Sequence, residues 1–230
     1  MLNYLNTKEL VSKTIYISLI IQILTTSISF QGFTIPLKKE DEILQSVLGI
    51  ETFVQFVEAF FYIWVILALE KKNELTQRRY IDWVITTPIM LISTIIYMDY
   101  KYHKETDNKI LSFKQYLSDN KRNIVIIGVL NALMLLFGYL GETGCMDKTT
   151  SISIGFIFFF AVFYFIYENH AKKTQSGKQL FYFMFSVWSF YGIAAMMDFN
   201  TKNTMYNMLD VVAKNFYGLF IYYKILQLRQ

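Results

Sequence analysis

The sequence predicts an all-α membrane protein, a bundle of seven transmembrane helices in a single domain that covers residues 1–230. Three observations lead to this fold class. Hydrophobic residues make up 54% of the chain, and there are only two prolines. Apolar runs of about twenty residues recur along the sequence, and a run of that length can cross a bilayer as a helix. A soluble domain would show amphipathic stripes separated by polar turns instead. We therefore expect a multi-pass integral membrane protein.

Seven apolar segments follow one another without an internal repeat or a linker. They cover, approximately, residues 10–30, 43–69, 79–98, 124–140, 152–167, 180–197 and 205–226. No small-residue cleavage site follows the first segment, so we expect a retained helix and not a signal peptide. Between the third and fourth segments, apolar residues recur near a helical period at 110–117. This pattern is typical of a helix along the membrane interface or of an ordinary loop.

The charge distribution indicates an orientation. Thirteen of the 22 Lys and Arg residues lie in the loops after segments one, three and five or after the last segment. The positive-inside rule places that side, with the C-terminus, in the cytoplasm and the N-terminus outside. The net charge of +4 is modest, which favours a membrane surface over nucleic acid as a partner. A single cysteine, Cys145, excludes an intrachain disulfide.

The last segment contains an ionisable pair. Asp210 and Lys214 are four residues apart, which places them on one helix face, one turn from each other. Charged side chains at membrane depth are costly and usually functional. A lysine amine can condense with an aldehyde to form a Schiff base, and a carboxylate one turn away can serve as its counterion. A structural ion pair that holds helices together is the alternative interpretation.

The third segment carries the most specific pattern, RYIDWVITTP at residues 79–88. Asp82 and Thr86 share a helix face, so we expect the hydroxyl to reach the carboxylate. Arg79 lies one turn away, where it can neutralise Asp82. Pro88 is compatible with a transmembrane helix if side chains or neighbouring helices satisfy the carbonyl that it leaves free.

These two motifs together resemble those of the microbial (type-1) rhodopsins, which have RYxDWxxTTP in the third of seven helices and DxxxK in the last. The resemblance extends over the whole chain. It implies all-trans retinal bound to Lys214 as a protonated Schiff base, with Asp82 as primary counterion and proton acceptor and Asp210 as second counterion. Two carboxylates and one arginine around one buried cation also satisfy the need to compensate buried charge.

The resemblance further implies a retinal pocket. By position in the motifs, its members are Trp83, Thr86, Thr87, Met90, Trp188 and Tyr191. Without the resemblance, aromatic residues at this density would indicate packing or interfacial anchors. An apolar Met90 implies absorption toward the green. Gly192 departs from the family, which often has proline after the tyrosine, so the local helix shape is open. We also expect Asn131 to pair with Thr87.

The second segment carries carboxylates that suggest ion transport. Glu51, Gln55 and Glu58 recur on one helix face over two turns. Carboxylates along one face of a membrane helix favour a wetted path for cations. The pattern resembles the glutamate ladder of channelrhodopsins, and some short viral rhodopsins share it. Asn215 matches the asparagine that those channels carry after the retinal lysine. A buried hydrogen-bonding pair, or a relay in a pump, is the alternative.

Outward pumps of this family usually place a carboxylic proton donor eleven residues after the acceptor, and this chain has Ser93 there. A serine hydroxyl cannot store a proton near neutral pH, which weakens the pump interpretation. Side chains that could extend the polar lining occur in the first, third and last segments. The complete set expected along the ion pathway is Ser18, Glu51, Glu58, Arg79, Ser93, Asn207 and Asn215.

We therefore expect a light-gated channel for monovalent cations or protons, embedded in the lipid bilayer, with no enzymatic activity and no bound metal. Formation of a homo-oligomer is compatible with the sequence. In the expected mechanism the Schiff-base proton moves to Asp82 or Asp210. Contacts among Glu51, Asn215 and the counterions then loosen, and water enters between segments one, two, three and seven. The alternatives are a light-driven outward proton pump, a sensory photoreceptor acting through a separate transducer, and a transporter without photochemistry.

Overall fold

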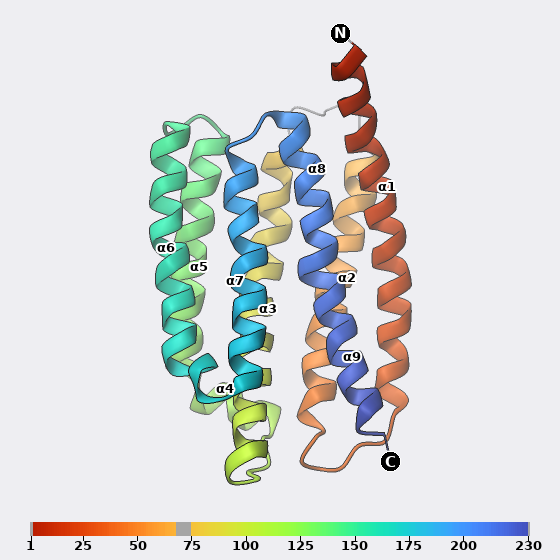
Figure 1. Ribbon diagram of the computed structural model, residues 1–230, viewed down its shortest axis with the longest axis vertical. Coiled ribbons are helices and arrows are strands. Elements are labelled where there is room, and N and C mark those ends of the chain that lie inside the picture. Colours follow the sequence, from red (N-terminus) through yellow and green to blue (C-terminus); the bar gives the residue numbers. More distant parts are fainter. Residues whose placement is uncertain (1, 68–74, 230) are drawn as a thin grey trace.

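The computed structural model describes residues 2–67 and 75–229, so the expected end of the second segment at 68–69 lies outside the described residues. Long helical rods run side by side along the molecule (Figure 1). Short 3-10 turns, η1 (Gly32–Thr34) and η3 (Ala171–Lys173), follow the first and fifth rods. The helices in chain order are α1 (Leu2–Gln31), α2 (Ile43–Leu67), α3 (Leu75–Thr106), α4 (Phe113–Asp119), α5 (Lys121–Glu142), α6 (Lys148–Asn169), α7 (Gln175–Ala195), α8 (Phe199–Asp210), a π-helix η4 (Val211–Phe216) and α9 (Tyr217–Gln227).

The last three of these elements follow one another without a gap in the chain, and we call them together the seventh helix. With α1, α2, α3, α5, α6 and α7 they confirm the expected seven-helix bundle. Each rod packs against the next, and α8 returns to α1, so the bundle is closed. The most apolar stretch of α3 is 67% buried, against 17% for α5. The third helix is therefore central, and α5 lies at the periphery.

Most helices extend beyond the apolar segments of the sequence because polar residues cap and lengthen them. The Asp147 carboxylate accepts a hydrogen bond from the Thr150 N–H at the start of α6, at 2.9 Å. The Thr174 hydroxyl accepts one from the Gly177 N–H at the start of α7, also at 2.9 Å. Such oxygens satisfy first-turn donors that have no partner within the helix. An apolar run thus marks where a helix crosses lipid, and not where the helix ends.

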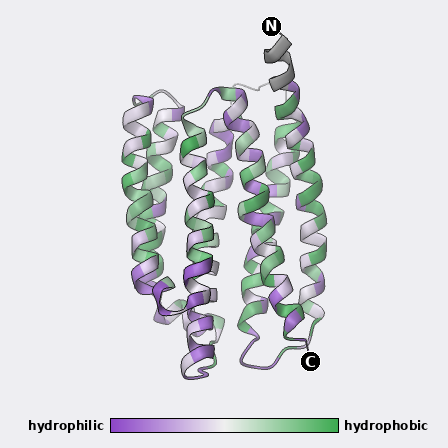
Figure 2. Cartoon of the chain, viewed as in Figure 1, coloured by the Kyte–Doolittle hydropathy of each residue, from purple (hydrophilic) through white to green (hydrophobic). Residues whose placement is uncertain are grey.

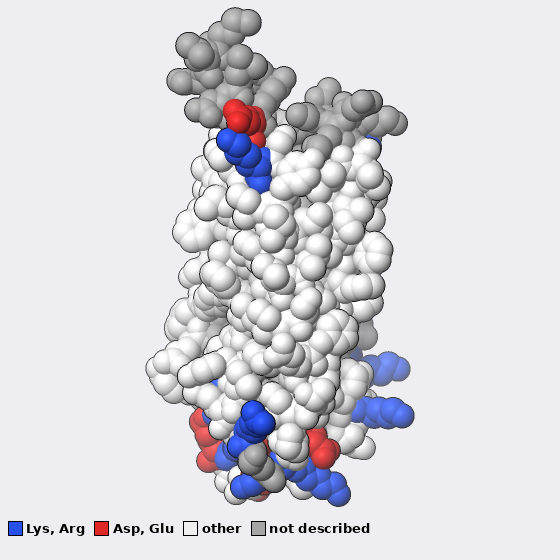
Figure 3. Space-filling model, turned by 90° about the vertical axis from the view of Figure 1, so that its right-hand side faces the viewer, with Lys and Arg blue, Asp and Glu red and all other residues white. Residues whose placement is uncertain are grey.

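The outer surface between the two ends of the bundle is apolar. Figure 2 shows hydrophobic residues along the outer helices, and Figure 3 shows a middle belt that is free of charged side chains on the face in view. Ile20, Phe56 and Ile157 are each more than half exposed. Apolar surface of this extent requires a nonaqueous surrounding, and five of the described helices are long and apolar enough to cross a membrane. The protein is a multi-pass integral membrane protein.

A buried carboxylate, Asp99, connects several elements at one end of the bundle. The charge distribution assigns this end to the cytoplasm. The Tyr116 hydroxyl donates to Asp99 at 2.7 Å, His170 Nδ1 lies 2.8 Å away and Lys173 Nζ lies 3.2 Å away. Burial and this carboxylate raise the pKa of Tyr116, so the hydroxyl keeps its proton. Tyr116 belongs to α4, so the region between the third and fourth segments contains a helix and is not an irregular loop.

Candidate functional site

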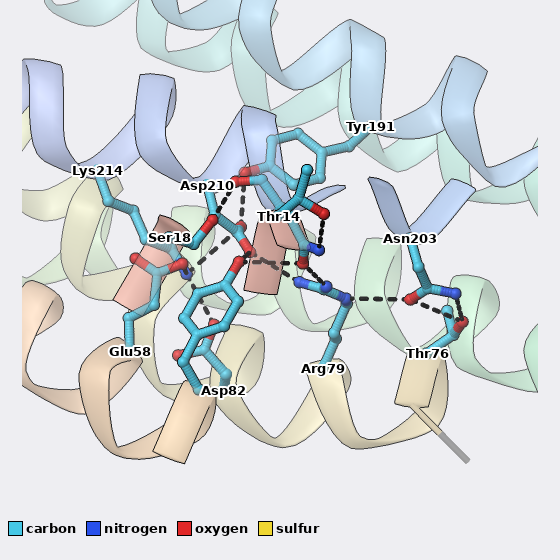
Figure 4. Close-up of polar contacts among 12 residues, drawn as sticks. Thr14, Ser18, Glu58, Thr76, Arg79, Asp82, Tyr191, Asn203, Asp210 and Lys214 are labelled. Carbon is cyan, nitrogen blue, oxygen red and sulfur yellow. Dashed lines mark hydrogen bonds and ion pairs between the residues drawn. The ribbon is translucent and has the colours of Figure 1, made fainter. Parts of the chain in front are cut away.

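Three carboxylates surround the amine of Lys214 at the centre of the bundle. Its Nζ lies 2.7 Å from Asp82, 3.0 Å from Glu58 and 3.6 Å from Asp210. Figure 4 shows these side chains reaching the amine from α3, α2 and the seventh helix. All four side chains are almost completely buried. The structure therefore brings both expected counterions to Lys214 and adds a third carboxylate, Glu58, which the sequence had placed in the ion pathway.

Arg79 is the second buried cation of the site, and its partner differs from the expected one. Its Nη1 donates to Asp210 Oδ2 at 2.8 Å, and among the described residues no ion pair joins it to Asp82. The guanidinium group also donates to the side-chain oxygens of Asn203 and Asn207. These asparagines and Asp210 lie at four- and three-residue intervals on α8, so they face Arg79 together. Arg79 therefore pairs directly with Asp210 and not with Asp82, because its long side chain reaches a neighbouring helix, and it acts on Asp82 through its charge at longer range.

The asparagines connect this cluster to α1. The Asn207 amide donates to the Thr14 hydroxyl at 2.8 Å, and the Ser18 hydroxyl donates to the backbone oxygen of Asn207 at 3.0 Å. Tyr62 of α2 donates to Asp210 at 2.9 Å. Ser18 and Asn207, two of the expected pathway residues, are therefore in direct contact, and Asn207 also contacts Arg79.

Thr86 does not bond the Asp82 carboxylate, contrary to expectation. Its hydroxyl donates to the backbone carbonyl of Asp82 at 3.0 Å. A helical threonine can bond the carbonyl four residues earlier, and that geometry turns the hydroxyl away from the carboxylate. Asp82 Oδ1 is buried and has no hydrogen-bond donor within the described part of the chain. One oxygen of the expected proton acceptor is thus available to a further donor.

A cavity beside Lys214 is lined by five of the residues expected around retinal. They are Trp83, Thr87, Met90, Trp188 and Tyr191, and Thr86 is not among the residues described along its wall. The Tyr191 hydroxyl also donates to Asp210 Oδ1 at 2.8 Å. An aromatic, largely apolar cavity with one lysine suits an extended apolar aldehyde. The residues present therefore fit retinal.

Two features shape the wall of this cavity. The Asn131 amide donates to the Thr87 hydroxyl at 2.8 Å, as expected, and joins α5 to α3. Helix α7 continues past Gly192 to Ala195. A Cβ atom at Gly192 would lie 2.8 Å from Cε2 of Phe156, closer than real Cβ contacts. Glycine at this position therefore allows α6 to approach α7 where the family often has proline.

Glu51 lies two turns from Glu58, toward the end of the bundle assigned to the cytoplasm. It is fully buried, and the Ser93 hydroxyl donates to its carboxylate. Asn215 accepts a hydrogen bond from Thr25 instead. The described residues show no hydrogen bond between Glu51 and Asn215, so these two side chains are not linked directly in the network that was expected among Glu51, Asn215 and the counterions.

A row of polar side chains on α1 also faces the site, and most of these residues were not predicted from the sequence. Ser18, Gln22, Thr25 and Ser29 are each at most 5% exposed. Gln22 donates to Glu58, Thr25 donates to Asn215, and Ser29 lies 3.4 Å from the side-chain oxygen of Gln55. Intervals of four, three and four residues place them on one helix face, and this spacing could have revealed them. We define the polar seam as Ser18, Gln22, Thr25, Ser29, Glu51, Gln55, Glu58, Asn207 and Asn215.

Lys214 and Asn215 lie in the π-helical segment Val211–Phe216. A π-helical turn has hydrogen bonds between residues five apart, is rare and often occurs at functional sites. Nothing in the local sequence predicted this π-helical turn. The position of this segment determines where along the bundle axis the Lys214 amine lies relative to the three carboxylates.

Comparison with known proteins agrees with this site. A family model described as bacteriorhodopsin-like protein matches residues 13–228. Green-light absorbing proteorhodopsin of Gamma-proteobacterium EBAC31A08 is 24% identical over 199 residues, covering 77% of this chain and 71% of that protein. The crystal structure of viral rhodopsin OLPVRII covers 96% of this chain and 100% of its own, with a TM-score of 0.82 and 29% identity. The light-driven proton pump Coccomyxa subellipsoidea rhodopsin covers 94% of this chain and 96% of its own, with a TM-score of 0.71 and 17% identity, and shows the fold alone. Because the family model covers nearly the entire sequence, this chain belongs to the bacteriorhodopsin-like family and is a microbial rhodopsin.

Proposed function

We propose that this protein is a light-gated cation channel that carries all-trans retinal on Lys214. Membership of the rhodopsin family supports light-driven ion transport. The polar seam is the observation that carries the finer proposal of a channel. A set of buried amides, hydroxyls and carboxyls between α1, α2 and the seventh helix, several of whose polar atoms have no partner among the described residues, is costly in a membrane protein unless it serves an ion or water path.

Retinal, when bound, supplies light absorption and an isomerisation that changes the direction of the bond from the lysine nitrogen to its proton. The side chains around that nitrogen then determine where the proton goes. Asp82 is the nearest carboxylate to Lys214 Nζ, at 2.7 Å, and Glu58 follows at 3.0 Å. Asp210 is farther from the amine and is occupied by Arg79. Asp82 is therefore the preferred acceptor, and Glu58 is the second.

The charges of the site couple proton transfer to helix contacts. Two cations, Lys214 and Arg79, face the three carboxyl groups of Asp82, Glu58 and Asp210. Moving a proton from the lysine nitrogen to Asp82 removes the charge of both groups. Glu58 then loses its ion pair with the seventh helix, and its remaining described partner is Gln22 on α1.

The polar seam has the length and chemistry of a closed pore. Its part on α1, from Ser18 to Ser29, rises ~16 Å, about half of the ~30 Å hydrocarbon core. Amide and hydroxyl oxygens can replace the hydration of a cation. Direct contacts close the seam at three levels, through Gln22 with Glu58, Thr25 with Asn215, and Ser29 with Gln55. Opening requires water to replace these contacts.

Voltage-clamp recording under illumination tests the proposal. The channel predicts a photocurrent whose sign reverses at a voltage set by the cation gradient. A current that stays outward at every voltage would identify a pump instead. Absence of any current, together with a slow photocycle, would favour a sensory photoreceptor.

A matched pair of variants tests whether the ions pass Glu51. Glu51→Gln replaces the fully buried, ionisable carboxyl of the seam by an amide, whereas Glu42→Gln makes the same change at an exposed site before α2. We expect Glu51→Gln to change conductance or cation selectivity and Glu42→Gln to leave both unchanged. An unaltered current in Glu51→Gln would remove this residue from the pathway.

One observation favours a light-driven outward proton pump as the second candidate. Ser93 stands where pumps of the family usually carry a proton donor, and its hydroxyl bonds Glu51. A carboxyl group on α2 therefore lies beside the position that lacks one on α3. In a pump, Glu51→Gln would slow recovery of the dark state while the current stays outward. In a channel, the same variant would alter a current that still reverses.

A further inference from the structure

We propose that the protein binds an anionic phospholipid in a cleft between α3, α7 and α9, at the end of the bundle assigned to the cytoplasm. The cleft has a volume of about 450 Å³. It forms because α7 packs against α8 and the π-helical segment but separates from α9 farther along (Figure 1). The retinal cavity is lined by other residues, with none in common. This site would serve a channel or a pump equally.

The cleft is polar at its mouth and apolar inside, in the same order on each helix. On the seventh helix, Lys224 lies at the mouth, and Phe220 and Phe216 follow one and two turns inward. On α3, Lys104 and Lys101 lie at the mouth, and Tyr97 lies farther inside. The rise from Lys224 to Phe216, eight residues along the helix, is ~12 Å. This gradient fits an amphiphile with a charged head group and an apolar chain, and not a small hydrophilic ion.

The positive charge at the mouth of the cleft favours an anionic ligand. Three lysines, Lys101, Lys104 and Lys224, line the cleft, and no carboxylate is found among its described lining residues. Lys104 is paired with Asp41, and Lys101 is in a partly exposed pair at 3.3 Å, a kind that contributes little. Lys224 donates to the neutral side chain of Gln227 at 3.2 Å, so its positive charge is available. Basic pockets between transmembrane helices on the cytoplasmic side bind anionic head groups.

The cleft is also open to the acyl region. Phe183 of α7 is 37% exposed and Phe216 is 55% exposed, and both line the cleft on the lipid side. A chain can therefore enter laterally. Phe216 is the last residue of the π-helical segment that carries Lys214. A bound lipid would brace this segment against α7, so its presence should alter the photocycle rate.

Lipid retention by the retinal-bound, full-length protein tests the proposal. Native mass spectrometry would compare titrations with phosphatidylglycerol and phosphatidylcholine of the same acyl chains. We expect one phosphatidylglycerol to be retained in preference to phosphatidylcholine. Lys224→Gln should weaken its binding about fivefold, the factor that corresponds to about 1 kcal/mol per lysine. Lys178→Gln is the matched control, since Lys178 lies on α7 at the same end and is not among the lining residues.

A second variant, Gln179→Trp, fills the mouth of the cleft from an exposed position and should abolish the preference. The visible absorption band reports that each variant is folded. Equal retention of the two lipids, or equal weakening in Lys224→Gln and Lys178→Gln, would overturn the proposal. So would tight binding in Gln179→Trp. If inorganic phosphate alone changes the photocycle rate as phosphatidylglycerol does in nanodiscs, the site recognises a free anion and the lipid assignment is wrong.

Discussion

The two sides of the bundle bury different kinds of side chain. Between α6 and α7, the rings of Phe159, Phe163, Phe181 and Phe185 pack with centroids 4.7 to 5.9 Å apart. Between α1, α2 and the seventh helix, the buried groups are those of the polar seam. Lys214 lies at the boundary, since it lines the aromatic cavity and also meets the carboxylates. One side contains an aromatic, largely apolar cavity, and the other buries polar and charged groups.

The largest expected effect is on Lys214, which joins the two sides. Lys214→Ala should abolish the visible absorption band of protein incubated with all-trans retinal, because no amine remains to form the imine. Lys202→Ala provides the control, since Lys202 is also buried but is paired with Glu142 at 2.6 Å, away from the cavity. A visible band in Lys214→Ala, or a colourless Lys202→Ala protein that is folded, would contradict the assignment.

The next effect concerns the charged side alone. Arg79→Gln leaves the Asp210 carboxylate buried without its guanidinium partner, and breaking a buried pair costs about 3–5 kcal/mol. The control is Arg78→Gln, because Arg78 is only partly buried and stacks on Trp64. Thermal bleaching of the visible band would measure both. Equal melting temperatures for the two variants would show that the arginine–aspartate pair does not stabilise the bundle.

A smaller effect is expected when one contact that closes the seam is removed. Thr25→Val keeps the shape of the side chain but removes its hydrogen bond to Asn215. A hydrogen bond contributes about 1 kcal/mol, so the balance between open and closed forms should shift about fivefold. Photocurrent decay after the light is turned off should slow accordingly. Ser27→Ala, two residues away on the exposed face of α1, should decay like the unaltered protein. Unchanged or faster decay in Thr25→Val would place the gate elsewhere.

The smallest effect is expected on the side of the chromophore. Asn131 and Thr87 form a hydrogen bond between α5 and α3 at 2.8 Å, and such bonds in membrane proteins contribute about 0.6 kcal/mol on average. A double-mutant cycle with Asn131→Leu and Thr87→Val, followed by thermal bleaching, would measure the coupling. If this coupling free energy equalled the stability lost in Arg79→Gln, a neutral hydrogen bond on the chromophore side would stabilise the protein as much as the buried ion pair on the other side.

Sequence patterns predicted the fold and the centre of the site because both depend on local features. Apolar runs of membrane length locate the rods, and the intervals within RYIDWVITTP and between Asp210 and Lys214 put functional groups on definite helix faces. The polar face of α1 was readable in the same way, from Ser18, Gln22, Thr25 and Ser29.

The contacts that the sequence did not predict all lie between helices or depend on competing rotamers. The position of Glu58 beside Lys214 depends on the axial register of α2 against the seventh helix, which no spacing within α2 reveals. Arg79 is flexible enough to choose between Asp82 on its own helix and Asp210 on another, and the asparagines of α8 favour the second. The Thr86 hydroxyl can reach either a backbone carbonyl or the Asp82 carboxylate, and it donates its hydrogen bond to the carbonyl.

The wide turn at Val211–Phe216 divides the seventh helix into two rods whose rotational phases are set separately. Before the turn, Asn203, Asn207 and Asp210 are aligned with Arg79. After it, Tyr217 and Ile221 are aligned with the core. Deleting one residue from the turn would rotate one rod against the other by about 100° and misalign one of these sets. The turn therefore lets one continuous helix present its polar residues to the arginine before the turn and its apolar residues to the core after it.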